Sequence, residues 1–116
     1  MAWHNDYGKR GEEEVYRYLL DKGYTVLERN WRVGHKEVDF VALDGEILVI
    51  VEVKTRFVAE EYPEEILSCR KKKNLLIAGA AYLNKYHVKR ELRFDLILVT
   101  GPTMLIEHIP DAISLW

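Results

Sequence analysis

The sequence has little cysteine, little proline and no long apolar run. Its single cysteine, Cys69, cannot form an internal disulfide and has no second cysteine with which to build a zinc site. The most apolar stretch, residues 75–83, is far shorter than the roughly 18 residues of a membrane-spanning helix. The first residues lack the apolar core of a signal peptide. We therefore expect a cytoplasmic protein with a reduced thiol and no membrane contact.

The chain also lacks internal repeats, low-complexity stretches and Pro/Gly/Ser-rich linkers, which excludes collagen-like and multi-domain organisation. What it has is 116 residues, of which 48% are hydrophobic and 31% charged, a composition typical of a globular chain. A chain of this length removes about two-thirds of its unfolded surface from water. Residues 1–116 are thus expected to form one domain.

No strong excess of either charge is present, because 17 basic and 19 acidic residues give a net charge of −2. This balance argues against indiscriminate binding to nucleic acid. The charges are segregated, however, with acid in residues 12–14 and 60–65 and base in residues 70–73 and 89–93. Such runs are either the solvated faces of helices or, on one side of the molecule, a phosphate-binding surface.

Hydrophobic periodicity and turn residues predict two helices and five strands. The predicted helices are residues 9–22 and 63–86, the second broken near Ser68, and the predicted strands are residues 24–33, 37–43, 46–54, 93–100 and 104–109. The order αβββαββ implies an antiparallel meander of three strands, then a helix that joins strands three and four in parallel. The expected fold class is α/β, or α+β in the strict sense, with a mixed β-sheet flanked by helices.

Two charged residues interrupt the third predicted strand, which is otherwise apolar enough to be covered on both faces. They are Glu52 and Lys54, whose spacing of two places both side chains on one face. Burial of such charges costs several kcal/mol unless they are paired. One explanation is an ion pair at the solvent-facing end of the strand, and the other is a functional site.

A hairpin loop at Asp44-Gly45 would set the register of strands two and three, with Asp39 facing Ile50 and Glu37 facing Glu52. Four charged residues then converge on one patch, with Asp39 diagonal to Glu52: Glu37, Asp39, Glu52 and Lys54. Three ionised carboxylates repel one another unless a cation lies between them. Hard oxygen ligands without nearby Cys or His favour Mg²⁺ or Mn²⁺. The predicted ligands are Asp39, Glu52 and the Val53 carbonyl, while Glu37 either ligates a second ion or completes the local hydrogen bonding.

The sequence resembles the small bacterial YraN family over nearly its whole length. The motifs that carry the resemblance, in order, are Gly8-Lys-Arg-Gly-Glu12, Gly23-Tyr24, Arg29-Asn-Trp-Arg32, Glu37-Val-Asp39, Asp44-Gly45, Val51-Glu-Val-Lys-Thr-Arg56, Pro63-x-Glu65 and Arg93-Phe-Asp95. That family looks like a PD-(D/E)XK nuclease domain, similar to archaeal Holliday-junction resolvases. The resemblance implies a restriction-endonuclease-like αβββαβ core in which Asp39, Glu52 and Lys54 are the metal-binding and catalytic residues, approached by Glu12.

These observations predict a Mg²⁺-dependent endonuclease that hydrolyses phosphodiester bonds in DNA, with branched or junction structures as candidate substrates. The alternative is a nucleic-acid-binding or assembly module that keeps the nuclease fold with little or no catalysis. A purely structural interaction domain would leave the carboxylates unexplained. A single domain of this size offers a small footprint on DNA, so a homodimer is expected as well.

Five basic residues are predicted to contact phosphates: Arg32, Arg56, Lys71, Lys72 and Lys73. Helical spacing places Lys71 on the same stripe as Leu67 and Leu75, so that Lys71 is predicted to face the carboxylates while Lys73 turns away. The four histidines show no ligand spacing and are expected on the surface or in loops: His4, His35, His87 and His108.

Overall fold

The computed structural model describes residues 2–56 and 67–113, and side chains from residue 6 onward. Its elements are α1 (Ala2–Asp21), β1 (Thr25–Val33), β2 (Lys36–Asp44), β3 (Ile47–Arg56), α3 (Cys69–Lys85), β4 (Leu92–Thr100) and β5 (Leu105–Ile109). Over the described residues, the predicted order of helices and strands is confirmed. The first helix begins at Ala2 rather than at the predicted residue 9.

The second helix begins later than predicted, at Cys69. Ser68 is the N-cap residue of this helix. It has extended backbone angles, and its hydroxyl accepts a hydrogen bond from the Lys71 amide at 3.1 Å. The predicted break near this serine is therefore the start of α3. The first turn predicted at residues 63–66 lies outside the described residues.

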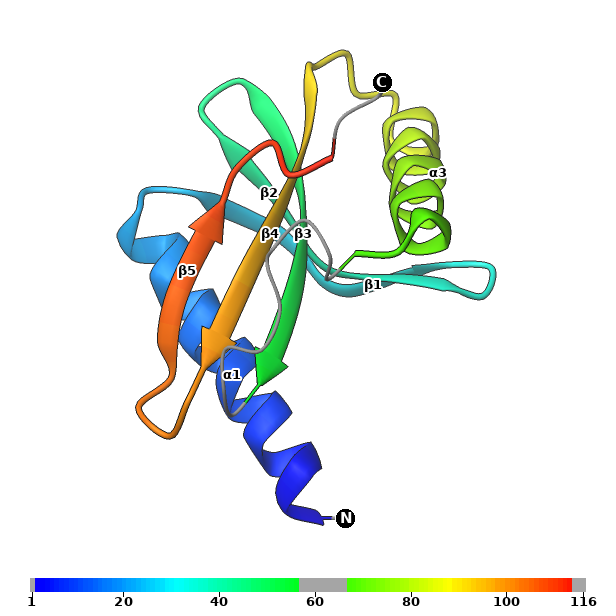
Figure 1. The fold of residues 1–116 in the computed structure, drawn as a ribbon. Helices are drawn as coiled ribbons and strands as arrows, with labels where there is room; N and C mark the ends of the chain where they lie inside the picture. Colours follow the sequence, from blue (N-terminus) through cyan, green and yellow to red (C-terminus); the bar gives the residue numbers. More distant parts are fainter. Residues whose placement is uncertain (1, 57–66, 114–116) are drawn as a thin grey trace.

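The five strands form one mixed sheet in the order β1-β2-β3-β4-β5 (Figure 1). Strands β1, β2 and β3 are antiparallel neighbours, β3 and β4 are parallel, and β5 returns antiparallel to β4. This is the predicted meander followed by a helical connection, and the predicted α+β class with helices on a mixed sheet is confirmed. No helix in residues 2–56 and 67–113 is long and apolar enough to cross a membrane.

Helices α1 and α3 cover opposite faces of the sheet, and each face has its own hydrophobic core. On the α1 face, Val15 and Leu19 pack against Val49, Val51 and other strand residues. On the α3 face, Leu75 and Tyr82 pack against neighbours that include Leu48 and Ile50. Because β3 alternates between the two cores, Glu52 and Lys54 continue the α3 face of the strand.

Helix α1 lies close to β3 at Gly11, where a Cβ atom would collide with the Thr55 side chain. The absence of a side chain at this position lets the helix backbone approach the sheet. Glu12 follows directly along the helix, so this contact fixes where its carboxyl can reach.

Strand β1 changes face at Asn30, whose φ of 52° is in the left-handed region that asparagine tolerates better than most residues. Before it, the Arg29 guanidinium lies 4.5 Å from the centroid of the Tyr16 ring on α1. After it, the Trp31 ring contacts the Tyr82 ring on α3 edge-to-face, with centroids 5.1 Å apart. The strand therefore contributes to both cores.

Candidate active site

The ladder between β2 and β3 corrects the predicted register. Val41 pairs with Ile50 and Asp44 with Ile47, so the two-residue loop is Gly45-Glu46 rather than Asp44-Gly45. A register shift of two positions by itself keeps each side chain on its predicted face. Strand β2 nonetheless changes face near Asp39, because Val38 packs with Val41 in the core on the α3 side while Phe40 packs in the core on the α1 side. The register shift does change partners, because the ladder ends at the Phe40–Val51 pair and the next step places Asp39 directly opposite Glu52.

Asp39 lies where β2 stops pairing with β3. Its Oδ2 atom accepts a hydrogen bond of 2.7 Å from the Val53 amide, so a side chain replaces the backbone partner that the ladder would otherwise supply. Glu12, from α1, has its carboxyl against that of Asp39. The structure thus brings together Glu12 and Asp39, as the family resemblance implies.

Glu52 is largely buried, with a side chain 15% exposed. The Lys71 ammonium on α3 lies 3.3 Å from Glu52 Oε2, an ion-pair distance without hydrogen-bond geometry. Glu52 Oε2 is buried and has no hydrogen-bond partner among residues 2–56 and 67–113. Buried polar atoms are rarely left in this state, so this oxygen is a candidate ligand atom.

Burial raises the pKa values of all three acids at this site. For Glu52, burial and the charge of Asp39 raise the pKa to about 7, although Lys71 opposes the shift. For Asp39, burial raises the pKa despite the Val53 amide and Lys71, and for Glu12 burial and Asp39 act in the same direction. The pair of Asp39 and Glu52 therefore holds a proton more readily than two separate carboxyls would.

The other two residues of the predicted patch lie outside this contact. Glu37 forms an ion pair with Arg32 at 2.8 Å, while its charge still raises the pKa of Asp39. Lys54 is exposed, and the cation against Glu52 is Lys71 instead. Across residues 2–56 and 67–113, no three His, Cys, Asp or Glu side chains are arranged to hold a metal ion by themselves. A metal here would need backbone, water or phosphate oxygens in addition.

The predicted phosphate-binding residues are spread over three places. Lys71 points toward the acids, as its helical spacing predicts, while Lys72 and the more exposed Lys73 follow it on the first turn of α3. Arg56, at the end of β3, donates a hydrogen bond of 3.1 Å to Thr100 Oγ1. Arg32 is largely exposed beside Glu37.

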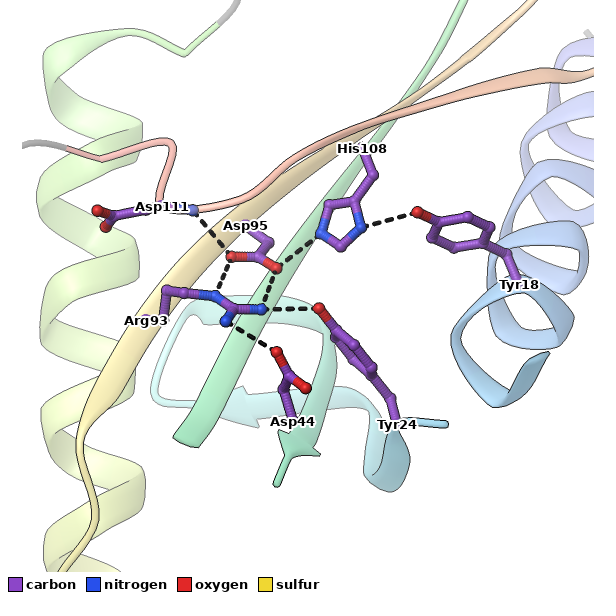
Figure 2. Close-up of polar contacts among 7 residues, drawn as sticks. All are labelled: Tyr18, Tyr24, Asp44, Arg93, Asp95, His108 and Asp111. Atoms are coloured by element: carbon purple, nitrogen blue, oxygen red, sulfur yellow. Dashed lines mark hydrogen bonds and ion pairs between the residues drawn. The ribbon is translucent and has the colours of Figure 1, made fainter. Parts of the chain in front are cut away.

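A second polar cluster, which sequence reasoning missed, lies on the α1 face of the sheet (Figure 2). The Asp95 side chain is fully buried, and its two oxygens accept hydrogen bonds of 2.9 Å each from Arg93, 2.7 Å from His108 Nε2 and 3.0 Å from the Asp111 amide. Arg93 also donates to Asp44 at 2.9 Å and to the Tyr24 hydroxyl at 2.7 Å. We call these residues, with Tyr18, the Asp95 network.

His108 contradicts the prediction that the histidines lie on the surface or in loops. It is on β5 with a side chain only 11% exposed, and its Nδ1 atom lies 2.9 Å from the Tyr18 hydroxyl of α1. The available signal was the spacing of Arg93 and Asp95, which places two opposite charges on one face of an apolar strand.

Comparison with known proteins identifies the relatives of this chain. Residues 11–99 match the family model described as uncharacterised protein family UPF0102. UPF0102 proteins from Phocaeicola vulgatus and Bacteroides thetaiotaomicron are each 43% identical over 115 residues, covering 97% of this chain and 95% of theirs.

The fold is similar to that of Hjc, a Holliday junction resolvase from Archaeoglobus fulgidus, with a TM-score of 0.57 and 18% sequence identity. The superposition covers 88% of this chain and 75% of that one. The predicted nuclease fold and the resemblance to YraN are thus confirmed, and the chain belongs to the UPF0102 (YraN) family.

Proposed function

We propose that the protein is a metal-dependent endonuclease that hydrolyses phosphodiester bonds in DNA. The observation that carries this proposal is the carboxylate pair of Asp39 and Glu52, in which a buried Glu52 oxygen has no hydrogen-bond partner among the described residues. The likeness of the fold to a Holliday junction resolvase supports the reaction class and suggests branched DNA as the substrate.

The residues present fit Mg²⁺ or Mn²⁺. Both would be bound by hard carboxylate oxygens, and a cation would offset the burial that raises the pKa values of Asp39 and Glu52, together with the charge of Asp39 that adds to the shift of Glu52. Asp39, Glu52 and the Val53 carbonyl would hold the ion, with Glu12 and Glu37 as further candidate ligands. When bound, the ion supplies Lewis-acid chemistry at the phosphate and a more acidic water.

The chain's own residues would perform the remaining tasks. Lys54, next to the acids along β3, would orient the attacking water and stabilise negative charge that develops on the phosphate. Glu12 would hold or transfer a proton beside Asp39. The basic residues at the start of α3 and at Arg32 and Arg56 would bind the flanking phosphates.

The direct test is a calorimetric Mn²⁺ titration of the wild type and Asp39→Asn, followed by cleavage assays on branched, flapped and linear DNA. The wild type should bind Mn²⁺ and cleave, while Asp39→Asn should lose both activities. Asp21→Asn, at the exposed end of α1, is the matched control and should behave as the wild type. Absence of Mn²⁺ binding by the wild type would refute the proposal.

One observation favours the alternative of a nucleic-acid-binding module with this fold. Lys71 already provides a cation beside Glu52, so the site is partly neutralised without a metal. Saturable DNA binding by a protein that binds Mn²⁺ but cleaves none of the three DNA forms would establish this alternative.

Lys71 is expected to act differently from the lysines that follow it. Removing its ammonium from a position 3.3 Å from Glu52 Oε2 takes away a competing positive charge, so Lys71→Ala should bind Mn²⁺ about tenfold more tightly. The same variant should cleave more slowly at saturating DNA, because the substrate phosphate loses a contact.

The control for Lys71 is the double variant Lys72→Ala with Lys73→Ala. It should leave Mn²⁺ affinity unchanged, weaken DNA binding and reduce its salt dependence by about two phosphate contacts. Calorimetry and DNA-binding titrations at several salt concentrations measure these effects. Identical behaviour of all three lysines would show that the run is an ordinary solvated helix face.

We also propose a cytoplasmic homodimer. Symmetric pairing would place two metal sites on a branched substrate whose arms are themselves related by symmetry. Sedimentation velocity should show a dimer whose population increases with protein concentration or on addition of four-way junction DNA. Monomer under both conditions would exclude the dimer.

A further inference from the structure

A pocket of about 510 Å³ opens beside the Asp95 network, on the face of the sheet opposite to Glu52. Its walls come from α1, the segment before β1, the end of β2, and β4 and β5, and are formed by Tyr18, Lys22, Tyr24, Asp44, Arg93, His108 and Pro110. This volume is in the range of small-molecule sites and exceeds what a single inorganic ion would fill. None of these residues takes part in the proposed nuclease chemistry.

The network is more polar than stability requires. Asp95 is the only charged residue that is fully buried within residues 6–56 and 67–113, and four hydrogen bonds saturate its carboxylate. Well-packed apolar side chains at such positions are often as stabilising as a buried ion pair. The ion pair therefore has a reason beyond folding, and five members of the network also line the pocket: Tyr18, Tyr24, Asp44, Arg93 and His108.

The hydrogen bonds of the network leave specific donors for a ligand. Because ionised Asp95 only accepts, His108 Nε2 carries a proton and donates to it, while Nδ1 and the Tyr18 hydroxyl are hydrogen-bonded to each other. Tyr24 accepts from Arg93, so its own O–H remains to donate, and burial raises the pKa of Tyr24 and keeps that proton in place. One N–H of the Arg93 Nη1 atom is also left over after its bond to Asp44.

Lys22 adds the strongest donor. Its ammonium lies 5.6 Å from the centroid of the Tyr18 ring, and no carboxylate within residues 6–56 and 67–113 is at ion-pair distance from it. The lining carries two cations, Lys22 and Arg93, and Arg93 is already paired with Asp44 and Asp95, so Lys22 is the cation that remains for a ligand. This ammonium and the remaining donors suit an oxyanion, while the rings of Tyr18, Tyr24 and His108 suit a flat apolar group.

We propose that this pocket binds a mononucleotide. Lys22, the Tyr24 hydroxyl and Arg93 would hold the phosphate, the aromatic rings would contact the base, and Asp44 would accept from a sugar hydroxyl or a base amino group. The site is separate from the metal site, so the inference does not depend on the proposed nuclease activity.

The test is calorimetric titration with AMP, with adenosine and inorganic phosphate as separate probes, in the presence of EDTA so that no divalent metal contributes. The wild type should bind AMP saturably and more tightly than either fragment. Lys22→Met should weaken AMP binding about tenfold and leave adenosine binding unchanged, because only the phosphate contact is lost. Tyr24→Phe should weaken AMP binding by a smaller factor.

Lys85→Met is the matched control, since the Lys85 ammonium also lies over a tyrosine ring, 5.4 Å from the centroid of Tyr86, but on α3. It and Asp39→Asn should bind AMP as the wild type does. No binding of AMP at millimolar concentration would overturn the inference. So would equal binding by Lys22→Met, which would place the nucleotide elsewhere, for example on the basic start of α3.

Discussion

Glu52→Gln is expected to stabilise the metal-free protein by about 1–3 kcal/mol at pH 8 and to have little effect at pH 4. The physical reason is that the wild-type carboxylate is buried beside Asp39 and has a pKa of about 7, above its ordinary value of 4.5. Glutamine has nearly the same shape and remains neutral. The variant therefore avoids the cost of ionising a buried acid.

The sign follows from proton binding by Glu52 in the folded and unfolded states. Between pH 4.5 and about 7 the folded protein holds a proton on Glu52 that the unfolded chain has released. The free energy of unfolding of the wild type consequently falls as the pH rises through this window. The difference between variant and wild type should grow over the same window and level off above it.

Guanidinium denaturation at pH 4, 6, 7 and 8, with and without Mg²⁺, measures this effect. Mg²⁺ should stabilise the wild type at pH 8 and leave Glu52→Gln unchanged, because the variant lacks a ligand. Glu107→Gln, an exposed glutamate on β5, is the control and should change stability by less than about 0.5 kcal/mol at every pH. A loss of stability in Glu52→Gln at pH 8 would show that Glu52 is a structural residue.

The order of elements could be predicted because it depends on local patterns. The apolar run of β3 reflects a strand that is covered on both faces, and the pattern of β2 reflects which of its faces is buried. Each pattern can be recognised within ten residues of sequence. The prediction that Asp39 lies near Glu52 was confirmed even though the predicted register of β2 and β3 was wrong. A shift of two positions preserves the face of every side chain, whereas a shift of one would have dispersed the site.

The error itself arose at the hairpin loop. Gly45 has a positive φ of 59°, which fits either the second position of an Asp44-Gly45 loop or the first position of the observed Gly45-Glu46 loop. Only packing across the sheet decides between them. The change of face of β1 at Asn30 could not be predicted from the sequence either, because asparagine tolerates the left-handed conformation without requiring it.

The Asp95 network could not be predicted because its members lie far apart in the sequence. Tyr18 and His108 are 90 positions apart, and Tyr24 and Arg93 are 69 apart. Spacing within β4 placed Arg93 and Asp95 on one face, but the partners that bury them arrive from other elements. Tertiary contacts of this kind leave no periodic signal in the sequence.

Asp95→Ala is expected to be the most destabilising single change, at about 3–5 kcal/mol. It removes the acceptor for Arg93, His108 and the Asp111 amide at once, at a carboxylate whose own side chain is fully buried. Asp44→Ala is the control, since Asp44 binds the same arginine at the same 2.9 Å but is 42% exposed. It should cost about 1 kcal/mol or less.

Lowering the pH should remove the difference in unfolding free energy between Asp95→Ala and the wild type. Burial alone would raise the pKa of Asp95, but the hydrogen bonds from His108, Arg93 and the Asp111 amide outweigh it and hold the pKa below its ordinary value of 3.8. Asp95 therefore contributes its full stability above pH 3.8 and loses it as the pH falls through the lower folded pKa. Denaturation curves from pH 7 to pH 2 should show Asp95→Ala and the wild type converging in acid, while the Asp44→Ala curve stays close to the wild type throughout. A constant difference down to pH 2 would mean that the lost stability comes from packing, and that the charge of Asp95 does not hold the network together.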